Sequence, residues 1–296
     1  MQGVKFKERY NKKQVIAGYL MILPALALFA VFFVYCLVQA FHYSLLDWNG
    51  VGSSVFVGLS NYRELFTNDV FWLSFGNNWY YALGIIVFGV FPGMLLAYLL
   101  SGPSVRGRAI FRSVYFLPRI ISAVVYGMVW VWIYDPRRGL LKKIIDLFGG
   151  QSIAMLGDIH TAMLGITITG GWTYFGFCMV IFLAAFMGRD QLLQESALID
   201  GATRLQIFWK IDLPQIKPVI NMLIIYTIID SFKVYDLVLV MTGGGPNNAT
   251  QIMTYYIYLQ AFELNRYGYG SAVAIVLGVF MVIFTILYNY LAERED

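Results

Sequence analysis

Long apolar stretches alternate with short polar segments along the whole sequence. A bilayer with a hydrocarbon core of roughly 30 Å requires about 20 apolar residues to cross it as a helix. Six stretches are long enough, near 14–39, 76–100, 113–134, 161–187, 218–241 and 271–292. The pattern predicts an all-α integral membrane protein with six transmembrane helices in one domain, 14–292, between cytoplasmic tails at 1–13 and 293–296.

The composition agrees with a membrane protein. Hydrophobic residues make up 59% of the chain and charged residues 13%, which is too little polar surface to enclose a water-soluble core. Short cytoplasmic loops carry an excess of lysine and arginine. Such residues gather before the first stretch, between the second and third, and between the fourth and fifth: Lys5, Lys7, Arg9, Lys12, Lys13, Arg106, Arg108, Arg112, Arg189, Arg204, Lys210 and Lys217. We therefore expect both termini to be cytoplasmic, although the basic cluster at 137–143 then falls outside.

The sequence lacks the features of a cofactor, nucleotide or metal site. Its two cysteines, Cys36 and Cys178, have no metal-like or disulfide-like neighbours, and its two histidines, His42 and His160, are isolated. The glycine-rich turn at 242–250 lacks the Gly-Lys-Ser/Thr that a phosphate-binding loop requires. We expect this chain to bind no cofactor.

A short amphipathic helix is predicted on the external side, between the third and fourth stretches. Its apolar face consists of Leu141, Ile144, Ile145 and Phe148, and its charged residues point away from that face. Two interpretations stay open. The helix either lies on the outer membrane surface or packs on the bundle as an ordinary loop helix.

The polar segment 188–217 separates the fourth and fifth stretches on the cytoplasmic side. Gly201 allows a sharp break between two short helices, and Asp200 can cap the second of them. Small residues near the break allow another surface to approach closely. The face that follows suits a partner's groove and comprises Ala202, Leu205 and Trp209. This face could instead pack on the cytoplasmic end of the bundle.

The fifth stretch carries three charged residues, Asp230, Lys233 and Asp236, which are costly inside a bilayer. On a continuous helix with 100° per residue they occupy an arc of about 120°, where Lys233 can neutralise either carboxylate. Three interpretations stay open: a structural ion pair, a polar lining that contacts a sugar, or a proton relay.

The fourth stretch contains Trp172 and Tyr174 beside small polar residues. Aromatic rings stack on the C–H faces of a sugar while hydroxyl groups find hydrogen-bond partners, so this composition suits a hydroxyl-rich ligand. We expect these rings to lie opposite the charges of the fifth stretch across a translocation cavity, with Ser231 and Tyr235 beside the charges. Packing within the bundle or at a bilayer interface is the alternative.

The segment 195–214 resembles the Glu-Ala-Ala motif through which membrane subunits of ABC importers dock onto their cytoplasmic ATPases. Its glycine and its final Ile-x-Leu-Pro stand at the spacing of that family. From about Tyr19 onward, further segments resemble the maltose-type carbohydrate importer permeases: Phe116-Leu-Pro118, Ser122, Asp135-Pro136, Gly139, Trp172, Gly176, Thr242-Gly-Gly-Gly-Pro246, Ala261-Phe262 and Gly268. Two residues depart from the family pattern: Ser196 replaces an alanine, and Arg119 stands where an aromatic residue is frequent.

The resemblance implies the type I ABC importer permease fold, with a coupling-helix hairpin at 188–217 and a sugar, in particular an oligosaccharide, as substrate. The implied partners are a second homologous permease subunit, a cytoplasmic ATPase dimer that binds ATP and Mg, an extracellular substrate-binding protein, and the lipid of a bacterial or archaeal cytoplasmic membrane. No nucleic acid partner and no catalytic residue is expected. The implied coupling residues are Glu195, Ala197, Asp200, Gly201, Ala202, Leu205, Trp209, Leu213 and Pro214. The expected substrate-pathway residues are Trp172, Tyr174, Asp230, Ser231, Lys233, Tyr235 and Asp236.

The charges of the fifth stretch would also suit an ion-coupled secondary transporter. Such a transporter needs no segment for docking an ATPase, so the segment 188–217 favours the ABC importer. An intramembrane enzyme is disfavoured because the apolar stretches contain no paired nucleophile and base and no metal-ligand spacing.

Overall fold

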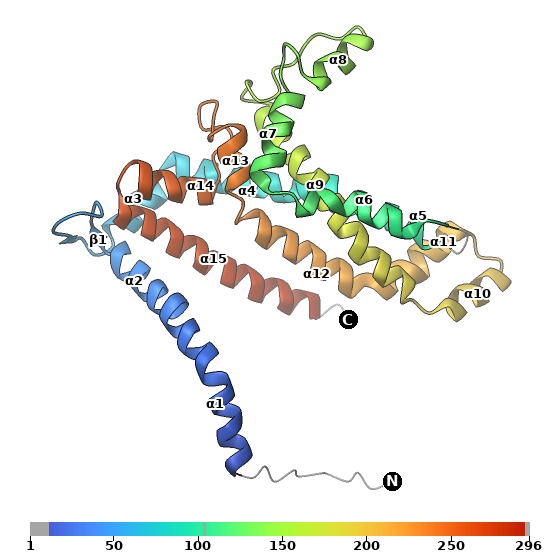
Figure 1. Cartoon of the computed structure of the whole chain (residues 1–296), viewed down its shortest axis with the longest axis horizontal. Helices are drawn as coiled ribbons and strands as arrows, with labels where there is room; N and C mark the ends of the chain where they lie inside the picture. Colours follow the sequence, from blue (N-terminus) through green and yellow to red (C-terminus); the bar gives the residue numbers. More distant parts are fainter. Residues whose placement is uncertain (1–11, 103–104, 294–296) are drawn as a thin grey trace.

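The computed structural model describes residues 12–102 and 105–293, and these residues are predominantly helical. Most of the two predicted tails, including Lys5, Lys7 and Arg9, lies outside the described residues. A bundle is formed by helices α4 (Asp69–Ile85), α5 (Phe91–Ser101), α6 (Arg108–Ile120), α9 (Ala162–Met187), α12 (Leu213–Ser231) and α15 (Tyr267–Glu293), as Figure 1 shows. The π-helical turn η2 (Ile86–Val90) joins α4 and α5 into one long helix.

Helix α9 lies at the centre of the bundle, where it packs against α4, α5, α6 and α12. The contacts are very close at glycines. A Cβ atom at Gly176 would lie 1.6 Å from the carbonyl oxygen of Tyr115 in α6, and one at Gly93 in α5 would lie 2.7 Å from that of Phe175. Small residues at such contacts let helix backbones approach each other inside a membrane. The glycines therefore fix how α9 sits between its neighbours.

The first predicted span is a helix that extends away from the bundle (Figure 1). It runs through α1 (Lys12–Phe29), the π-helical turn η1 (Ala30–Val34) and α2 (Tyr35–Ser44), and α2 alone packs against α15. No residue in the most apolar part of this helix is buried. Such a large apolar surface has to be covered by lipid or by another protein.

The third predicted span, 113–134, is not one straight helix. Helix α6 ends at Ile120 and α7 (Ala123–Ile133) begins after a bend of 96°. Ile121 and Ser122 have extended backbone, with ψ of 138° and 140°. The bend follows Pro118, which has no N–H for the helical ladder and so weakens the last turn of α6.

The fifth predicted span, 218–241, is also interrupted, and here the expectation of a continuous helix was wrong. Helix α12 ends at Ser231, and α13 (Asp236–Met241) begins only after four residues outside any helix. The carbonyl of Ser231 accepts a hydrogen bond from the Asn78 side chain at 3.0 Å, and that of Phe232 accepts one from Thr254 at 2.8 Å. These side chains satisfy the carbonyl groups that a continuing helix would have used.

Four helical segments in the described chain are long and apolar enough to cross a membrane: Ile16–Ser44, Asp69–Ser101, Ala162–Met187 and Tyr267–Ala292. The bent pair α6–α7 adds a fifth if it is counted as one span. The stretch 218–241 is not among them, because its helix ends early. The count of six spans therefore stays a prediction.

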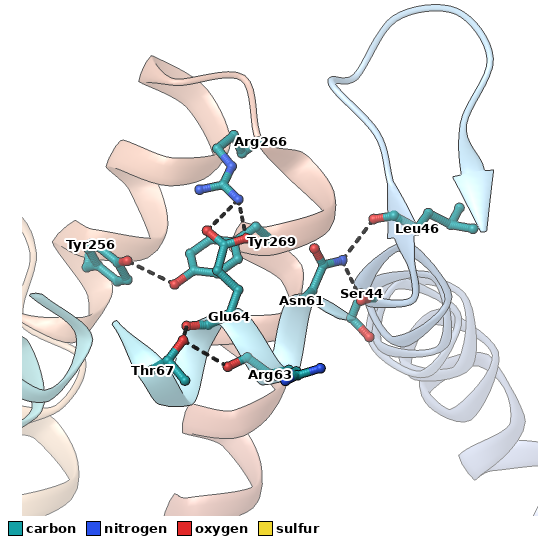
Figure 2. A network of polar contacts seen from close by, with 9 residues as sticks. All are labelled: Ser44, Leu46, Asn61, Arg63, Glu64, Thr67, Tyr256, Arg266 and Tyr269. Carbon is teal, nitrogen blue, oxygen red and sulfur yellow. Dashed lines mark hydrogen bonds and ion pairs between the residues drawn. The ribbon is translucent and has the colours of Figure 1, made fainter. Parts of the chain in front are cut away.

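The end of the bundle that is predicted to be external is held together by polar contacts of α3 (Ser60–Thr67) with α2, with Leu46 and with Arg266 just before α15, shown in Figure 2. Asn61 in α3 donates to the carbonyl groups of Ser44 and Leu46, both at 2.9 Å. Arg266 binds the Glu64 carboxylate at 2.6 Å. The short hairpin β1 (Leu46–Asp47) and β2 (Val55–Phe56), α14 (Met253–Tyr258) and the π-helical turn η4 (Leu259–Glu263) complete this end.

The predicted external amphipathic helix is α8 (Leu140–Leu147), and it lies away from the bundle (Figure 1). Leu141 packs against the core cluster, whereas Ile144 and Phe148 are 45% and 87% exposed. Helix α8 contains no buried residue. Within this chain, it therefore does not pack on the bundle as an ordinary loop helix.

The close contact at Gly176 generates a stability prediction. Gly176→Ala should lower the free energy of unfolding by about 1–3 kcal/mol, because the added methyl group forces α6 away from α9. The measurement is thermal or denaturant unfolding of the purified chain in detergent. Gly278→Ala in α15 is the matched control, since a Cβ there meets nothing within 4 Å. Equal stability of the two variants would contradict the role given to this contact.

Candidate functional site

A polar, half-open cavity of about 220 Å³ lies between helices of the bundle. It is bounded by α4, by the α6–α7 bend, by α9 and by the break between α12 and α13. Its lining residues are Tyr81, Arg119, Ala123, Tyr126, Tyr174, Asp230, Lys233, Val234, Tyr235, Asp236 and Leu237. Of the seven residues predicted from the sequence for a substrate pathway, five meet here: Tyr174, Asp230, Lys233, Tyr235 and Asp236.

Arg119 connects the helices that surround this cavity. Its guanidinium lies 3.1 Å from the Asp230 carboxylate and donates to the Tyr226 hydroxyl at 3.3 Å. The Tyr174 hydroxyl donates to the same carboxylate of Asp230. The guanidinium also lies over the ring of Tyr174, 4.5 Å from its centroid, and over the ring of Phe177 at 5.1 Å. Arg119 therefore balances Asp230 and covers one face of Tyr174.

Lys233 does not have the role expected from the sequence. Within the described part of the chain it forms no ion pair with Asp230 or Asp236, and Asp236 likewise has no hydrogen-bond or ion-pair partner. Lys233 and Asp236 are both exposed at the cavity. The reason is the helix break, because the i,i+3 geometry that would pair these residues exists only on a continuous helix.

The two remaining predicted residues lie elsewhere. Trp172 is 40% exposed and contacts the rings of Tyr126 and Trp130, outside the cavity lining. Residues two apart on a helix point about 200° apart, so α9 cannot present Trp172 and Tyr174 on one face. Ser231 is buried at 1% exposure and is not part of the lining either.

Sequence reasoning missed the other lining residues, of which three are polar, Tyr81, Arg119 and Tyr126, and three apolar, Ala123, Val234 and Leu237. A signal for Arg119 was present, because it is a cation within the predicted span 113–134 and departs from the family pattern. A charge inside a span requires a partner. Looking for that partner would have led to Asp230.

A second candidate site lies at the end of the bundle opposite α3 and the β-hairpin (Figure 1). We call it the cytoplasmic corner, after the side of the membrane that the basic residues predict for it, and it comprises α10 (Gln191–Ile199), the turn at 200–203 and α11 (Arg204–Ile207). Gly201 has φ of +81°, a conformation that residues with a side chain rarely adopt. The prediction that Asp200 caps the second helix was wrong. Thr203 caps α11 in a reciprocal arrangement with Gln206, with hydrogen bonds of 3.3 and 2.8 Å.

The cytoplasmic corner has a largely uncovered surface. Leu205 and Trp209 are 68% and 62% exposed, and Glu195 is exposed as well. A hollow of about 330 Å³ lies beside Gly201 and Ala202. The other predicted coupling residues are also exposed or partly buried: Ala197 and Asp200 in the corner, and Leu213 and Pro214 at the start of α12. Trp209 likewise lies just beyond the corner, after α11. In this chain, the apolar face after the break is open to a partner rather than packed on the bundle.

A buried polar cluster lies where the corner meets the bundle. Arg189 follows α9, and its guanidinium lies 3.1 Å from the carboxylate of Asp212 in the π-helical turn η3 (Phe208–Asp212). Gln194 in α10 donates to the same carboxylate at 2.5 Å. Asp212 is 1% exposed. This burial raises the pKa of Asp212 above that of an ordinary aspartate, against the opposing effects of the Gln194 hydrogen bond and the Arg189 charge.

A bent helical bundle with an open corner at one end and a polar cavity between its helices fits a membrane transport subunit. Residues 89–296 match the family described as binding-protein-dependent transport system inner membrane component, and the chain belongs to this family. It is therefore a transport subunit rather than an enzyme. The ion-coupled secondary transporter is set aside by the same finding.

Relatives and solved structures agree with this family. The chain is 34% identical over 271 residues to the probable ABC transporter permease protein YurN of Bacillus subtilis, covering 90% of this chain and 92% of that protein. It is 32% identical over 283 residues to the trehalose/maltose transport system permease protein MalF of Thermococcus litoralis, covering 95% of each. It also resembles a chain in the crystal structure of a bacterial ABC transporter that imports the acidic polysaccharide alginate, with a TM-score of 0.82 at 22% identity over 95% of this chain and 96% of that chain.

The contact between Arg119 and Asp230 can be tested by stability. Asp230→Asn should lower the free energy of unfolding by about 1–3 kcal/mol, because it removes a hydrogen-bonded charge partner inside the bundle. Asp236→Asn, which removes a carboxylate of the same cavity that has no such bond, is the matched control and should change little. Denaturant unfolding of the purified chain in detergent measures both. If both variants lowered the free energy of unfolding by a similar amount, the Arg119–Asp230 contact would not be a specific source of stability.

Proposed function

We propose that this chain is one permease subunit of an ABC importer that carries a neutral sugar, in particular an oligosaccharide, into the cell. The observation that carries the proposal is the composition of the cavity. Tyrosine rings and hydroxyls stand there beside two cations, Arg119 and Lys233, and two carboxylates, Asp230 and Asp236. Such a lining offers stacking surfaces, donors and acceptors without net charge.

The name of a relative supports a sugar as the substrate. MalF of Thermococcus litoralis, which is similar to nearly the whole chain, is named for the transport of trehalose and maltose. Alginate, the cargo of the structurally similar importer, is acidic. An acidic substrate would favour an excess of cations in its pathway, and the balanced charges of this cavity favour a neutral sugar instead.

The complete transporter would contain further subunits. The exposed apolar surface of α1 and α2 supports contact with a second, homologous permease subunit as well as with lipid. A binding protein on the outside would deliver the substrate, as the description of the family implies. In this arrangement the chain crosses the cytoplasmic membrane of a bacterium or archaeon six times, and both of its termini are cytoplasmic.

The cytoplasmic corner would be the coupling hairpin that docks onto an ATPase dimer. Its exposed apolar residues, its hollow beside Gly201 and its resemblance to the Glu-Ala-Ala motif support this role. ATP and Mg would be bound by the ATPase and not by this chain. Closure of the ATPase dimer would draw the corners of two permeases together and favour the conformation that is open to the outside.

The substrate can be identified through the binding protein that works with this permease. Thermal shift across a panel of sugars should show stabilisation of that protein by a neutral oligosaccharide and not by uronate or phosphorylated sugars. Uptake of the same sugar into vesicles that contain the whole transporter should then depend on ATP. Selective stabilisation by an acidic sugar would refute the neutral substrate while leaving the importer assignment intact.

Gly201 provides a test of the docking surface. Gly201→Leu and Gly201→Ala impose the same backbone strain of roughly 1–2 kcal/mol, because both place a side chain at positive φ. A Cβ at Gly201 meets nothing within 4 Å in the chain itself, and the hollow beside it leaves space for a larger side chain, so a difference between the two variants points to a partner. Gly201→Leu should abolish ATPase binding and uptake, whereas Gly201→Ala should retain most of both. Copurification of the ATPase and vesicle uptake are the measurements. Equal activity of the two variants would contradict docking at this corner.

A further inference from the structure

Helix α10 is held to the bundle in an unusual way. None of its residues is buried, so apolar packing does not determine its orientation. The proposed function, on which this inference rests, requires α10 to transmit movement from an ATPase to the bundle. A helix that slides freely over the bundle could not do so. The polar contacts at its N-terminal end therefore carry this connection.

The side-chain contacts involve three residues, Arg189, Gln194 and Asp212, which we call the cytoplasmic brace. Beside them, the N–H of Asp190, the N-cap of α10, donates to the Gln215 side chain in α12 at 2.9 Å. Asp212 is buried, with 1% exposure, and its two carboxylate oxygens have separate partners. One oxygen accepts the hydrogen bond from Gln194 in α10, and the other lies 3.1 Å from Arg189. Asp212 thus joins α10 to the segment that follows α9.

Aromatic rings hold the brace in position. The Arg189 guanidinium lies 5.7 Å from the ring centroid of Tyr98 in α5 and 5.6 Å from that of Phe186 in α9. The Tyr98 ring also packs on Phe208, with centroids 4.5 Å apart. Contacts of this kind hold the guanidinium beside Asp212, with which it forms an ion pair at 3.1 Å but no hydrogen bond. Because α5, α9 and η3 all contribute, the brace is anchored in the bundle and not in the corner.

The brace also joins the two helices that carry the cavity. Arg189 lies two residues after the end of α9, and Asp212 directly precedes α12. At the cavity the same two helices are joined again, by the hydrogen bond from Tyr174 to Asp230. Helices α9 and α12 are therefore joined at two places, at the brace and at the cavity, which lie far apart along each helix.

We propose that Arg189 and Asp212 are positioning residues, linked to α10 by Gln194, which turn a displacement of the cytoplasmic corner into a joint movement of α9 and α12 around the cavity. They would contact neither ATP nor sugar. Without Arg189, Asp212 would be a buried carboxylate lacking its cation, which is strongly unfavourable. Without Gln194, the ion pair would persist while α10 lost its side-chain contact with Asp212 and kept the backbone hydrogen bond from Asp190 to Gln215.

The difference between these two losses defines the experiment. Gln194→Leu removes the hydrogen bond between α10 and Asp212 and leaves the ion pair of Arg189 and Asp212 in place. Asp212→Ala removes both contacts. Each variant is made in a background in which Cys36 and Cys178 are replaced by alanine, with a nitroxide attached at Leu198→Cys on the exposed side of α10. Spin-label spectra of the permease in lipid nanodiscs report the mobility of α10. ATPase binding, stimulation by the loaded binding protein and uptake are measured on the whole transporter.

The brace predicts a more mobile label in both variants, with the ATPase still bound and its stimulation lowered on the order of tenfold, a magnitude typical of coupling between sites. Lys142→Gln, which breaks the exposed ion pair of Lys142 and Asp146 in α8, is the matched control. It should change neither the mobility of the label nor the stimulation of the ATPase. If Asp212→Ala fails to insert, Gln194→Leu decides the question.

Two results would overturn the proposal. One is an immobile label with wild-type stimulation in Gln194→Leu. The other is a loss of stimulation that occurs to the same extent in Lys142→Gln. Neither result would contradict the proposed function. The proposed function fails if the wild-type chain neither binds nor stimulates an ATPase.

Discussion

Close packing around α9 is the constraint on which the rest of this molecule depends. Helices α4, α5, α6 and α12 all pack against α9, and glycines such as Gly93 and Gly176 bring the backbones nearly into contact. Inside a bilayer the hydrophobic effect does not drive helices together, so the fit of small residues has to hold them. Because α9 is fixed in this way, Tyr174 stands at a defined place in the cavity and Arg189 at a defined place beside the corner.

Much of the fold could be predicted from hydrophobic pattern alone. Five of the predicted stretches lie within helices or a bent helix pair that can cross a membrane, and the helical break at Gly201 was predicted from glycine chemistry. The early end of α12 could not be predicted, because it depends on hydrogen bonds from Asn78 and Thr254, which are distant in sequence. A local pattern contains no information about which remote side chain will satisfy a carbonyl group.

The candidate cavity was predicted in part, and the errors have physical causes. Asp230, Lys233 and Asp236 do share one cavity, but their pairing was derived from a continuous helix that does not exist. Trp172 was grouped with Tyr174 by composition, although the helical angle between them separates their faces. Arg119 was noticed only as a departure from a family pattern. The energetic cost of placing the Arg119 charge inside a predicted span was the stronger signal, because such a charge requires a carboxylate partner.

The charge balance of the cavity has an electrical consequence. Arg119 and Lys233 offset Asp230 and Asp236, so the lining carries no net charge. Moving one elementary charge across a membrane potential changes the free energy by about 2.3 kcal/mol per 100 mV. If the cavity switches between the two sides of the membrane with the proposed uncharged sugar inside, the potential does no net work on these four groups when they move together. In the proposed transporter these groups would then not couple the switching step to the membrane potential, and the direction of transport would be set by the ATPase.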